Sequence, residues 1–355
     1  MKVLFVDNGI RGHHFQYFDS LCSIKSVEPI LVLPEYCPDS DYRQIKYNNI
    51  EGKRRNFIIY IKWLIEIKKI AKKTKPDIIH FLYGDAFYRY FGVGLLLLKH
   101  FRVLITFHEA RKQKIQIVSL RMIMRHVTGG VVHSKYMKKM LRAHGLKNIC
   151  HIEYPCFNTS KIVTEEAKKY WGIEQNRKVL GCLGSTDHYK GLDILLDALK
   201  DTKISITVLI AGAQRYFTEE YIRRKSKEYD DNIRIVYHLD YLTEEEFNCA
   251  LNASDYIVLP YRKEFQGASG PLAEGVSLGK CIIGTDFGTI GNTIIENHLG
   301  YTFEAENTKA LSDVINSALL NTFSQDDLYL SYQKSLDVKY FKKKYCKLFE
   351  KVYDL

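Results

Sequence analysis

Short apolar runs alternate with amphipathic segments along the first half of the chain. Residues 2–7 predict a buried strand, and a helix is predicted from His13 to about Ile24. The alternation continues with predicted strands at 29–33, 77–81, 103–107 and 130–133 and predicted helices at 58–73 and 115–126. Strands that alternate with helices are typical of a parallel sheet covered on both faces. The first half therefore predicts a doubly wound α/β domain.

The alternation pauses near Tyr154 and Pro155, and the following residues up to Gln175 are polar and rich in lysine. A second series then predicts strands at 178–183, 204–211, 233–237, 256–260 and 281–284 and helices at 192–199, 219–229, 244–253 and 271–278. The length of 355 residues also suits two domains. We expect one Rossmann-like domain over 1–157, a second over 158–335, and a helix within 336–355 that packs back toward the first domain.

Several classes of protein are disfavoured by composition. The longest apolar stretch, 91–98, falls well short of the ~20 residues that span a bilayer. The N-terminal run ends at Asp7 and is typical of a strand rather than a signal peptide, so a cytoplasmic location is expected. The eight cysteines include no C-x-x-C pair, which favours neutral thiols over a zinc site, and we expect no bound metal.

The formal net charge is +11, and lysines and arginines crowd residues 53–75 and 111–125. Such charge attracts nucleic acid, anionic lipid or phosphate-bearing small molecules. The helix around 62–75 carries Trp63, Leu64, Ile67 and Ile70 between lysines, which suits either an anionic membrane surface or a helix packed on the sheet with a solvated lysine face. Because no zinc-finger or RNA-binding aromatic motif accompanies the charge, no nucleic-acid partner is expected.

Chemistry is most strongly indicated between residues 259 and 280. A predicted strand ends there, the chain turns through small residues from Gly267 to Gly270, and a helix opens with Pro271 in its first turn. The backbone N–H groups of such a turn can hold a phosphate, and Glu274, one helical turn later, would reach a ribose hydroxyl. The alternative interpretation is an ordinary capped helix.

A second loop, from Leu183 to Asp193, also follows a strand and precedes a helix. Loops after the strands of two tandem doubly wound domains are expected to face an interdomain cleft. Lys190 would then supply a counter-charge to a diphosphate, and a solvated lysine is the alternative.

Together these two segments resemble the retaining GT-B glycosyltransferases, specifically glycosyltransferase family 4, whose second domain carries a G-x(5–6)-KG loop and an E-x7-E pattern. The resemblance covers nearly the whole second half and implies a GT-B fold. It implies that Lys190 contacts the donor diphosphate, that Glu274 contacts the ribose and that the amides at Ser269 and Gly270 hold phosphate. The complete donor-binding set that we predict is Gly12, Gly184, Ser185, Lys190, Gln266, Gly267, Ala268, Ser269, Gly270 and Glu274.

Two positions depart from the family pattern. Gln266 stands where the first glutamate of E-x7-E is expected, and it can donate and accept hydrogen bonds but cannot ionise. Asp187 falls where many members carry an arginine. Arg262 is our candidate for the missing positive charge.

In the first half, the segment from Asn8 through Gly12 to Phe15 resembles the glycine loop that follows the first strand in this family. It lacks G-x-G-x-x-G spacing, which counts against a dinucleotide oxidoreductase. We expect His13 and His14 in this segment to bind the acceptor. His108 follows a predicted strand and corresponds to the histidine at the sugar-transfer end of the family's site, with a structural histidine as the alternative.

The resemblance implies transfer of a sugar from a nucleotide-diphosphate sugar to a glycan or lipid-linked acceptor, with retention at the anomeric carbon. It suggests a role in cell-surface polysaccharide or glycoconjugate biosynthesis, peripheral to the inner face of a membrane. Lys190, Arg262 and His108 form the predicted catalytic set, and fixed cations and amides would stabilise the leaving group without a metal or other cofactor. Two alternatives stay open: a non-catalytic homologue that binds nucleotide or glycan, and a basic nucleic-acid-binding protein.

Overall fold

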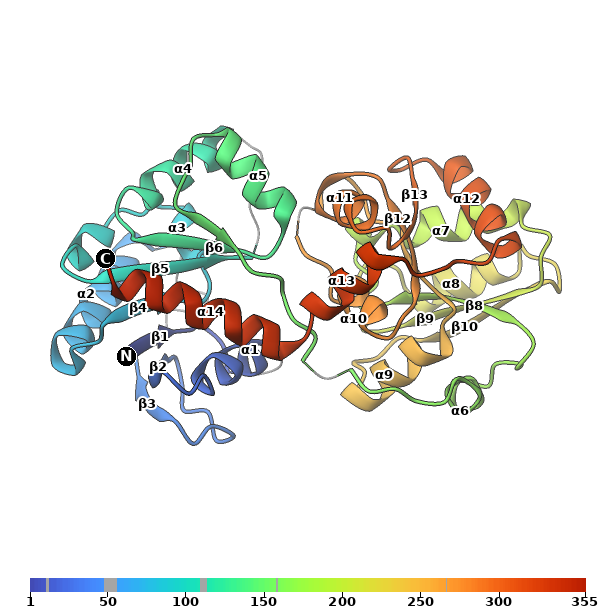
Figure 1. Cartoon of the computed structure of the whole chain (residues 1–355). Helices are drawn as coiled ribbons and strands as arrows, with labels where there is room; N and C mark the ends of the chain where they lie inside the picture. The colour runs from blue at the N-terminus through green and yellow to red at the C-terminus, as the bar shows by residue number, and fades with distance from the viewer. Residues whose placement is uncertain (11–12, 48–55, 109–113, 158, 266) are drawn as a thin grey trace. The chain divides into compact units, whose positions relative to one another are not determined.

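The structure is a computed structural model that describes residues 1–10, 13–47, 56–108, 114–157, 159–265 and 267–355. The chain forms two compact units (Figure 1). The first unit contains residues 1–154 and 338–355, and the second contains residues 155–337. Because the C-terminal segment belongs to the first unit, the chain enters and leaves the second unit once.

The first unit is built on a seven-stranded parallel sheet with the order β3-β2-β1-β4-β5-β6-β7. Most of its strands are short, largely apolar runs in which most positions are buried, as a sheet covered on both faces requires. The strands are β1 (Lys2–Val6), β2 (Glu28–Leu33), β3 (Arg43–Lys46), β4 (Ile78–Phe81), β5 (Arg102–Phe107), β6 (Gly129–Val132) and β7 (Ile149–His151).

Helices cover both faces of this first sheet. One face shares a hydrophobic core with α2 (Phe57–Thr74), the 3₁₀ helix η1 (Leu95–Leu98), α4 (Lys114–Met124) and α5 (Lys135–Ala143), with the short α3 (Asp85–Tyr88) beside α4. The other face carries α1 (His13–Cys22) and the C-terminal helix α14 (Val338–Tyr353). Phe349 of α14 packs on Phe5 of β1, and Tyr345 lies within hydrogen-bonding distance of Tyr17 and Thr106.

The second unit is built on a six-stranded parallel sheet with the order β10-β9-β8-β11-β12-β13. Its strands are β8 (Lys178–Leu183), β9 (Ile206–Ala211), β10 (Ile233–His238), β11 (Tyr256–Leu259), β12 (Cys281–Thr285) and β13 (Gly300–Phe303). Its helices are α6 (Thr164–Tyr170), η2 (His188–Lys190), α7 (Leu192–Ala198), η3 (Leu199–Asp201), α8 (Glu219–Ser226), α9 (Glu244–Ala253), α10 (Gly270–Ser277), α11 (Gly288–Glu296), α12 (Thr308–Leu320) and α13 (Asp327–Ser335).

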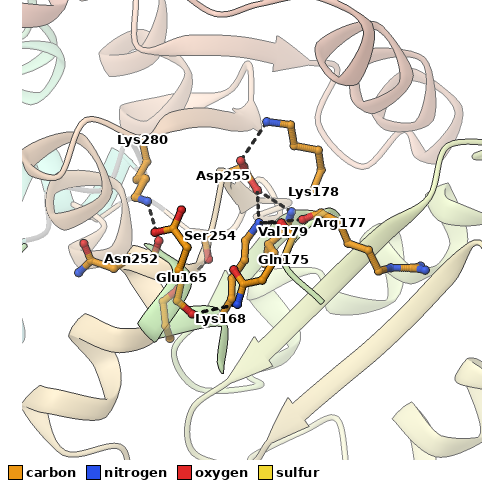
Figure 2. A network of polar contacts seen from close by, with 11 residues as sticks. Glu165, Lys168, Gln175, Arg177, Lys178, Val179, Asn252, Ser254, Asp255 and Lys280 are labelled. Carbon is orange, nitrogen blue, oxygen red and sulfur yellow. Dashed lines mark hydrogen bonds and ion pairs between the residues drawn. The ribbon is translucent and has the colours of Figure 1, made fainter. Parts of the chain in front are cut away.

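A polar network ties together the amino ends of the strands in the second sheet (Figure 2). Lys168 is buried and donates to the carbonyl oxygens of Gln175 (3.2 Å) and Arg177 (2.9 Å). Asp255 accepts from the Val179 backbone N–H at 2.9 Å, and Lys280 donates to the carbonyl of Asn252 at 2.9 Å. These contacts satisfy buried polar groups at one edge of the sheet. The loops at the opposite, carboxyl edge are the ones that carry ligands in this type of sheet.

The fold class predicted from the pattern is confirmed, because the chain forms two Rossmann-like parallel sheets covered by helices. Several elements were not predicted, including the edge strands β3, β7 and β13. The lysine-rich stretch after Pro155 contains α6 rather than a plain linker. No helix within the described ranges is both long enough and apolar enough to cross a membrane.

The helix α2 corrects one suggestion from the sequence. Trp63, Leu64 and Ile67 are buried in the core of the first unit, and Ile70 packs against that core. These side chains therefore cannot contact lipid. The helix packs on the sheet through these side chains, and its outer face carries exposed lysines together with Phe57, Ile58 and Ile65.

Candidate functional site

The first part of the candidate site is the loop after β8. Gly184 adopts φ of +102° and Gly191 adopts φ of +66°, which are left-handed conformations that favour glycine. A side chain at Gly191 would also collide with the carbonyl oxygen of Pro260. The loop is held further by the backbone N–H of Arg262, which donates to the carbonyl of Tyr189 at 2.8 Å. The glycines thus let the loops after β8 and β11 pack backbone against backbone.

Lys190 lies in this loop and folds back over Gly184. A Cβ atom on Gly184 would lie 2.5 Å from the Lys190 Nζ, so a larger residue at Gly184 would displace the ammonium from this position. The Nζ also lies 5.8 Å from the centre of the Tyr261 ring, which is cation–π distance. In the described part of the chain no carboxylate forms an ion pair with Lys190. Lys190 is half-buried, and no carboxylate among the described residues is placed to compete with an anionic ligand for its ammonium.

Ser185 and Asp187, two other polar residues of the loop, bind each other. Ser185 Oγ donates to Asp187 Oδ2 at 2.6 Å, and the Tyr189 hydroxyl donates to the same oxygen at 3.3 Å. Asp187 is thus occupied with stabilising its own loop. Binding of a donor by Ser185 stays a prediction.

Arg262, the predicted extra cation, lies in a bidentate ion pair. Its Nη2 and Nη1 atoms lie 2.6 and 3.1 Å from the two carboxylate oxygens of Asp193 in the first turn of α7. Fork-shaped pairs of this kind are among the strongest ion pairs that proteins form. Sequence reasoning did not identify Asp193 as the partner. The role of Arg262 toward a donor stays a prediction.

The second part of the site is the first turn of α10, after the neighbouring strand β11. Ser269 caps the helix, since its Oγ accepts from the Leu272 N–H at 3.3 Å, and Pro271 occupies the first turn. Within the described ranges, the N–H of the exposed Gly270 donates to no partner. A helix N-terminus with an unpaired N–H and a partial positive charge favours an anion. Gly267 and Ala268 precede this turn, whereas Gln266 lies outside the described residues.

Glu274 lies beneath this turn. Its Oε2 is 3.4 Å from the position that a Cβ on Gly270 would take. Burial raises the pKa of the Glu274 carboxyl to about 7, and the charge of Glu244 adds to the effect. Near neutral pH this carboxyl is therefore divided between its charged and protonated forms, and a partner that donates hydrogen bonds would favour the charged form.

The first unit carries a separate cluster where β1, β4, β5 and β6 end. Asp7 directly follows β1 and is 2% exposed. Its Oδ1 accepts from the N–H groups of Asn8 and Gly9 and lies 2.7 Å from His14 Nδ1. Its Oδ2 is buried without a hydrogen-bond partner among the described residues and lines a small cavity with Trp63 and Tyr83. From the sequence, Asp7 is recognisable only as the end of a strand.

Aromatic rings connect His14 to His108 in this cluster. The Tyr83 ring lies between them, 4.1 Å from each imidazole, and it stacks on His108 at an angle of 13°. His108 Nε2 donates to the carbonyl of Leu82 at 2.9 Å, which fixes the orientation of its ring. His108 and His14 therefore belong to one cluster, and their predicted roles toward the sugar and the acceptor stay predictions. Gly12 lies outside the described residues, and the side chain of His13 is not described.

His133 completes the cluster from β6. It is buried, its Nδ1 lies 2.8 Å from the carbonyl of Ile152, and its Nε2 lies 3.2 Å from the Tyr17 hydroxyl. Burial lowers the pKa of His133 to about 4, so its ring is neutral at physiological pH. A neutral, fully bonded histidine has a structural role in holding Tyr17 beside His108, 5.5 Å from ring to ring.

The chain resembles known proteins in sequence and in fold. Residues 163–334, most of the second unit, match the family model described as glycosyl transferases group 1. The second unit therefore contains a glycosyltransferase domain of the group 1 type. The chain is 22% identical over 312 residues to an uncharacterized glycosyltransferase of Methanocaldococcus jannaschii. The aligned region covers 84% of this chain and 82% of that protein.

Solved structures agree in fold. A glycosyltransferase from Rickettsia africae superposes with a TM-score of 0.76 at 18% identity, covering 99% of this chain and 98% of the other. The HepE protein of Anabaena in complex with UDP superposes with a TM-score of 0.72 at 12% identity, covering 99% and 100%. At such identities the likeness shows the fold, which is that of the GT-B glycosyltransferases.

Proposed function

We propose that the protein transfers a glycosyl group from a nucleotide-diphosphate sugar to a glycan or lipid-linked acceptor, with retention of the anomeric configuration. The observation that carries this proposal is the placement of Lys190 in the second unit. Its ammonium has no carboxylate partner in the described ranges and lies over the bare backbone of Gly184. The strands that precede Lys190 and the first turn of α10 are neighbours in the sheet, so both features lie at one edge.

The chemistry requires stabilisation of the nucleoside diphosphate as it leaves the sugar. A fixed ammonium and oriented backbone N–H groups can supply it, and we assign this role to Lys190 and the first turn of α10. Glu274 would accept hydrogen bonds from the ribose hydroxyls. In a same-face transfer the leaving phosphate accepts the acceptor's proton, so the proposal needs no protein nucleophile. Asp193 already pairs with Arg262, so we assign the main positive charge to Lys190.

The acceptor is assigned to the cluster in the first unit. Imidazole and carboxylate groups bind sugar hydroxyls, and flat rings such as that of Tyr83 suit the apolar face of a sugar. His14 and His108, which flank Tyr83, are the proposed contact residues. The family resemblance and the basic first half support a role in polysaccharide or glycoconjugate synthesis at the cytoplasmic face of a membrane.

A nucleotide-binding screen tests the donor assignment. Thermal shifts are measured with UDP, GDP, ADP and CMP, and UDP comes first because the HepE structure of Anabaena contains it. A ligand at ~100 times its dissociation constant adds ~2.7 kcal/mol of stability. A matching nucleotide sugar is then tested for turnover, and the product anomer is identified by NMR. The absence of any shift would reject the donor assignment, and an inverted product would reject retention.

The variant Lys190→Ala tests the residue that carries the proposal. A charge-assisted hydrogen bond contributes roughly 1.5–3 kcal/mol, so binding of the nucleotide should weaken about 10- to 150-fold. Lys309→Ala is the matched control, since Lys309 on α12 forms an exposed ion pair with Asp313. If Lys190→Ala and Lys309→Ala bind the nucleotide with equal affinity, Lys190 does not contact the nucleotide.

A non-catalytic homologue is the second candidate function, favoured by the pairing of Arg262 with Asp193. It predicts that nucleotide binds without sugar transfer and without slow hydrolysis of the donor. The basic nucleic-acid binder instead predicts tight, salt-dependent binding of oligonucleotides and no response to nucleotide sugars.

A further inference from the structure

Three segments of the first unit lie side by side and present one outer surface. They are α2, residues 89–100 and α4, and all three contribute to the same core on one face of the sheet. Gly94 lies directly against Leu64 of α2, and Gly92 lies against Ile123 of α4. Residues 89–100 are therefore packed between the two helices, whose positions in the first unit are labelled in Figure 1.

This surface carries apolar side chains that are exposed among the residues that the structure describes. On α4, Ile115, Val118 and Met122 are 63%, 45% and 37% exposed. Their spacing of three and four residues places them in one stripe. The exposed apolar residues of the whole surface are Phe57, Ile58, Ile65, Val93, Leu96, Ile115, Val118 and Met122.

Cations surround these apolar side chains. On α4 and just beyond it, Lys114, Arg121 and Arg125 are exposed beside the stripe. The other exposed cations of the surface are Lys62, Lys69, Lys72, Lys73, Arg89 and Lys99. Across 57–74, 89–100 and 114–125, the sequence contains one acidic residue, Glu66, and it is half-buried. We call this surface the basic apolar face.

We propose that the basic apolar face docks the protein on an anionic phospholipid bilayer. Apolar side chains at an amphipathic surface enter the interface between headgroups and acyl chains, while neighbouring lysines and arginines contact anionic headgroups. A second copy of the same face would bring cations against cations. Nucleic acid would match the charge and leave the apolar stripe without a partner.

Docking would also suit the acceptor cluster. The helix α4 begins at Lys114, a short distance along the chain from His108. An acceptor anchored in the bilayer would thus be presented near the N-terminal end of the face. The docking proposal itself does not depend on transferase activity, because it concerns only the surface and the lipid.

Vesicle flotation of the whole protein, without donor or acceptor, tests the proposal. Vesicles of phosphatidylcholine alone are compared with vesicles that contain one third phosphatidylglycerol, at low and high salt. The wild type should float with the anionic vesicles, and floating should decrease as salt rises. The triple variant I115S/V118S/M122S should bind at least tenfold more weakly.

A control triple variant, I295S/L320S/L328S, removes exposed apolar side chains of similar size from the second unit and should bind like the wild type. A charge variant, K114Q/R121Q/R125Q, provides an independent check, because it should also lose the anionic vesicles even if the serine variant does not fold. Circular dichroism and the nucleotide-induced thermal shift are recorded for every preparation, so that a failure of docking is distinguished from a failure of donor binding.

Three results would overturn the proposal. The first is equal binding of the α4 and control variants to anionic vesicles. The second is absence of wild-type vesicle binding together with self-association that the α4 variant abolishes, which would assign the face to a second copy of the chain. The third is absence of vesicle binding together with oligonucleotide binding that the charge variant abolishes.

Discussion

Replacing Glu274 with glutamine should make the protein more stable and, at the same time, a poorer nucleotide binder. Burial raises the pKa of this carboxyl from its ordinary 4.5 to about 7. Between these two pH values the folded state holds a proton that the unfolded state has released, so stability falls as pH rises. At 1.36 kcal/mol per pH unit, the loss approaches about 3 kcal/mol above pH 7.

A neutral amide of the same shape avoids this cost. We therefore expect the wild type and Glu274→Gln to be similarly stable near pH 4.5, and the variant to be more stable by up to about 3 kcal/mol at pH 8. Glutamine cannot provide an ionised acceptor for the ribose hydroxyls. A hydrogen bond to a charged group contributes ~1.5 kcal/mol to binding, so nucleotide affinity should weaken at least tenfold.

Denaturant unfolding from pH 4.5 to 8.5 is the assay. The protein has two tryptophans, Trp63 in the first unit and Trp171 in the second, so a Trp63→Phe background lets Trp171 fluorescence report on the second unit. Glu245→Gln, which replaces an exposed carboxyl on α9, is the matched control. Parallel stability profiles for the wild type and Glu274→Gln would refute the reasoning, because the buried carboxyl would then cost nothing.

Two further predictions concern stability. Gly191→Ala should destabilise the second unit by more than ~3 kcal/mol, because the new Cβ would collide with the Pro260 carbonyl, whereas Gly172→Ala, with φ of +62° and open space around it, should cost only ~1 kcal/mol. Comparable losses in the two variants would contradict this, and thermal unfolding measures both. For Lys280, burial lowers the pKa to about 8 from 10.5, with a further contribution from Lys168. Since only the unfolded state stays protonated between these values, stability should rise with pH there by up to about 3 kcal/mol, and Lys280→Met should abolish the rise.

Long, strongly patterned elements were predictable from the sequence, and short or exposed ones were not. The apolar runs of β1, β5, β8 and β9 carry their own signal, because a strand buried on both faces must be apolar throughout. In contrast, β3 reads Arg-Gln-Ile-Lys and β7 has three residues. Such edge strands exist because a neighbouring strand offers hydrogen bonds, and a local pattern does not show this.

The candidate site also contains features that a local sequence pattern predicts and features that it does not. Lys190, Glu274 and the small residues before Pro271 were identified because a loop after a strand has a recognisable composition. The pairing of Arg262 with Asp193 joins a loop residue to the first turn of α7, 69 residues away, and no local pattern indicates it. The Asp7–His14 contact was also missed, because Asp7 alone gives no sign of its partner.

The sequence by itself determined the two parallel sheets, the loops that end their strands and the excess of positive charge, since each follows from the order of residue types along the chain. Only the tertiary structure decided which charges are neutralised and which apolar side chains are covered. Arg262 and Lys190 are both cations in loops, yet among the described residues only Arg262 forms an ion pair. Likewise Leu64 and Ile115 are both apolar residues of basic helices, yet one is buried and the other is exposed. Charge pairing and burial depend on which residues the fold brings within a few ångströms of a side chain. Those residues can be far away in the sequence, so the order of residues along the chain does not reveal them.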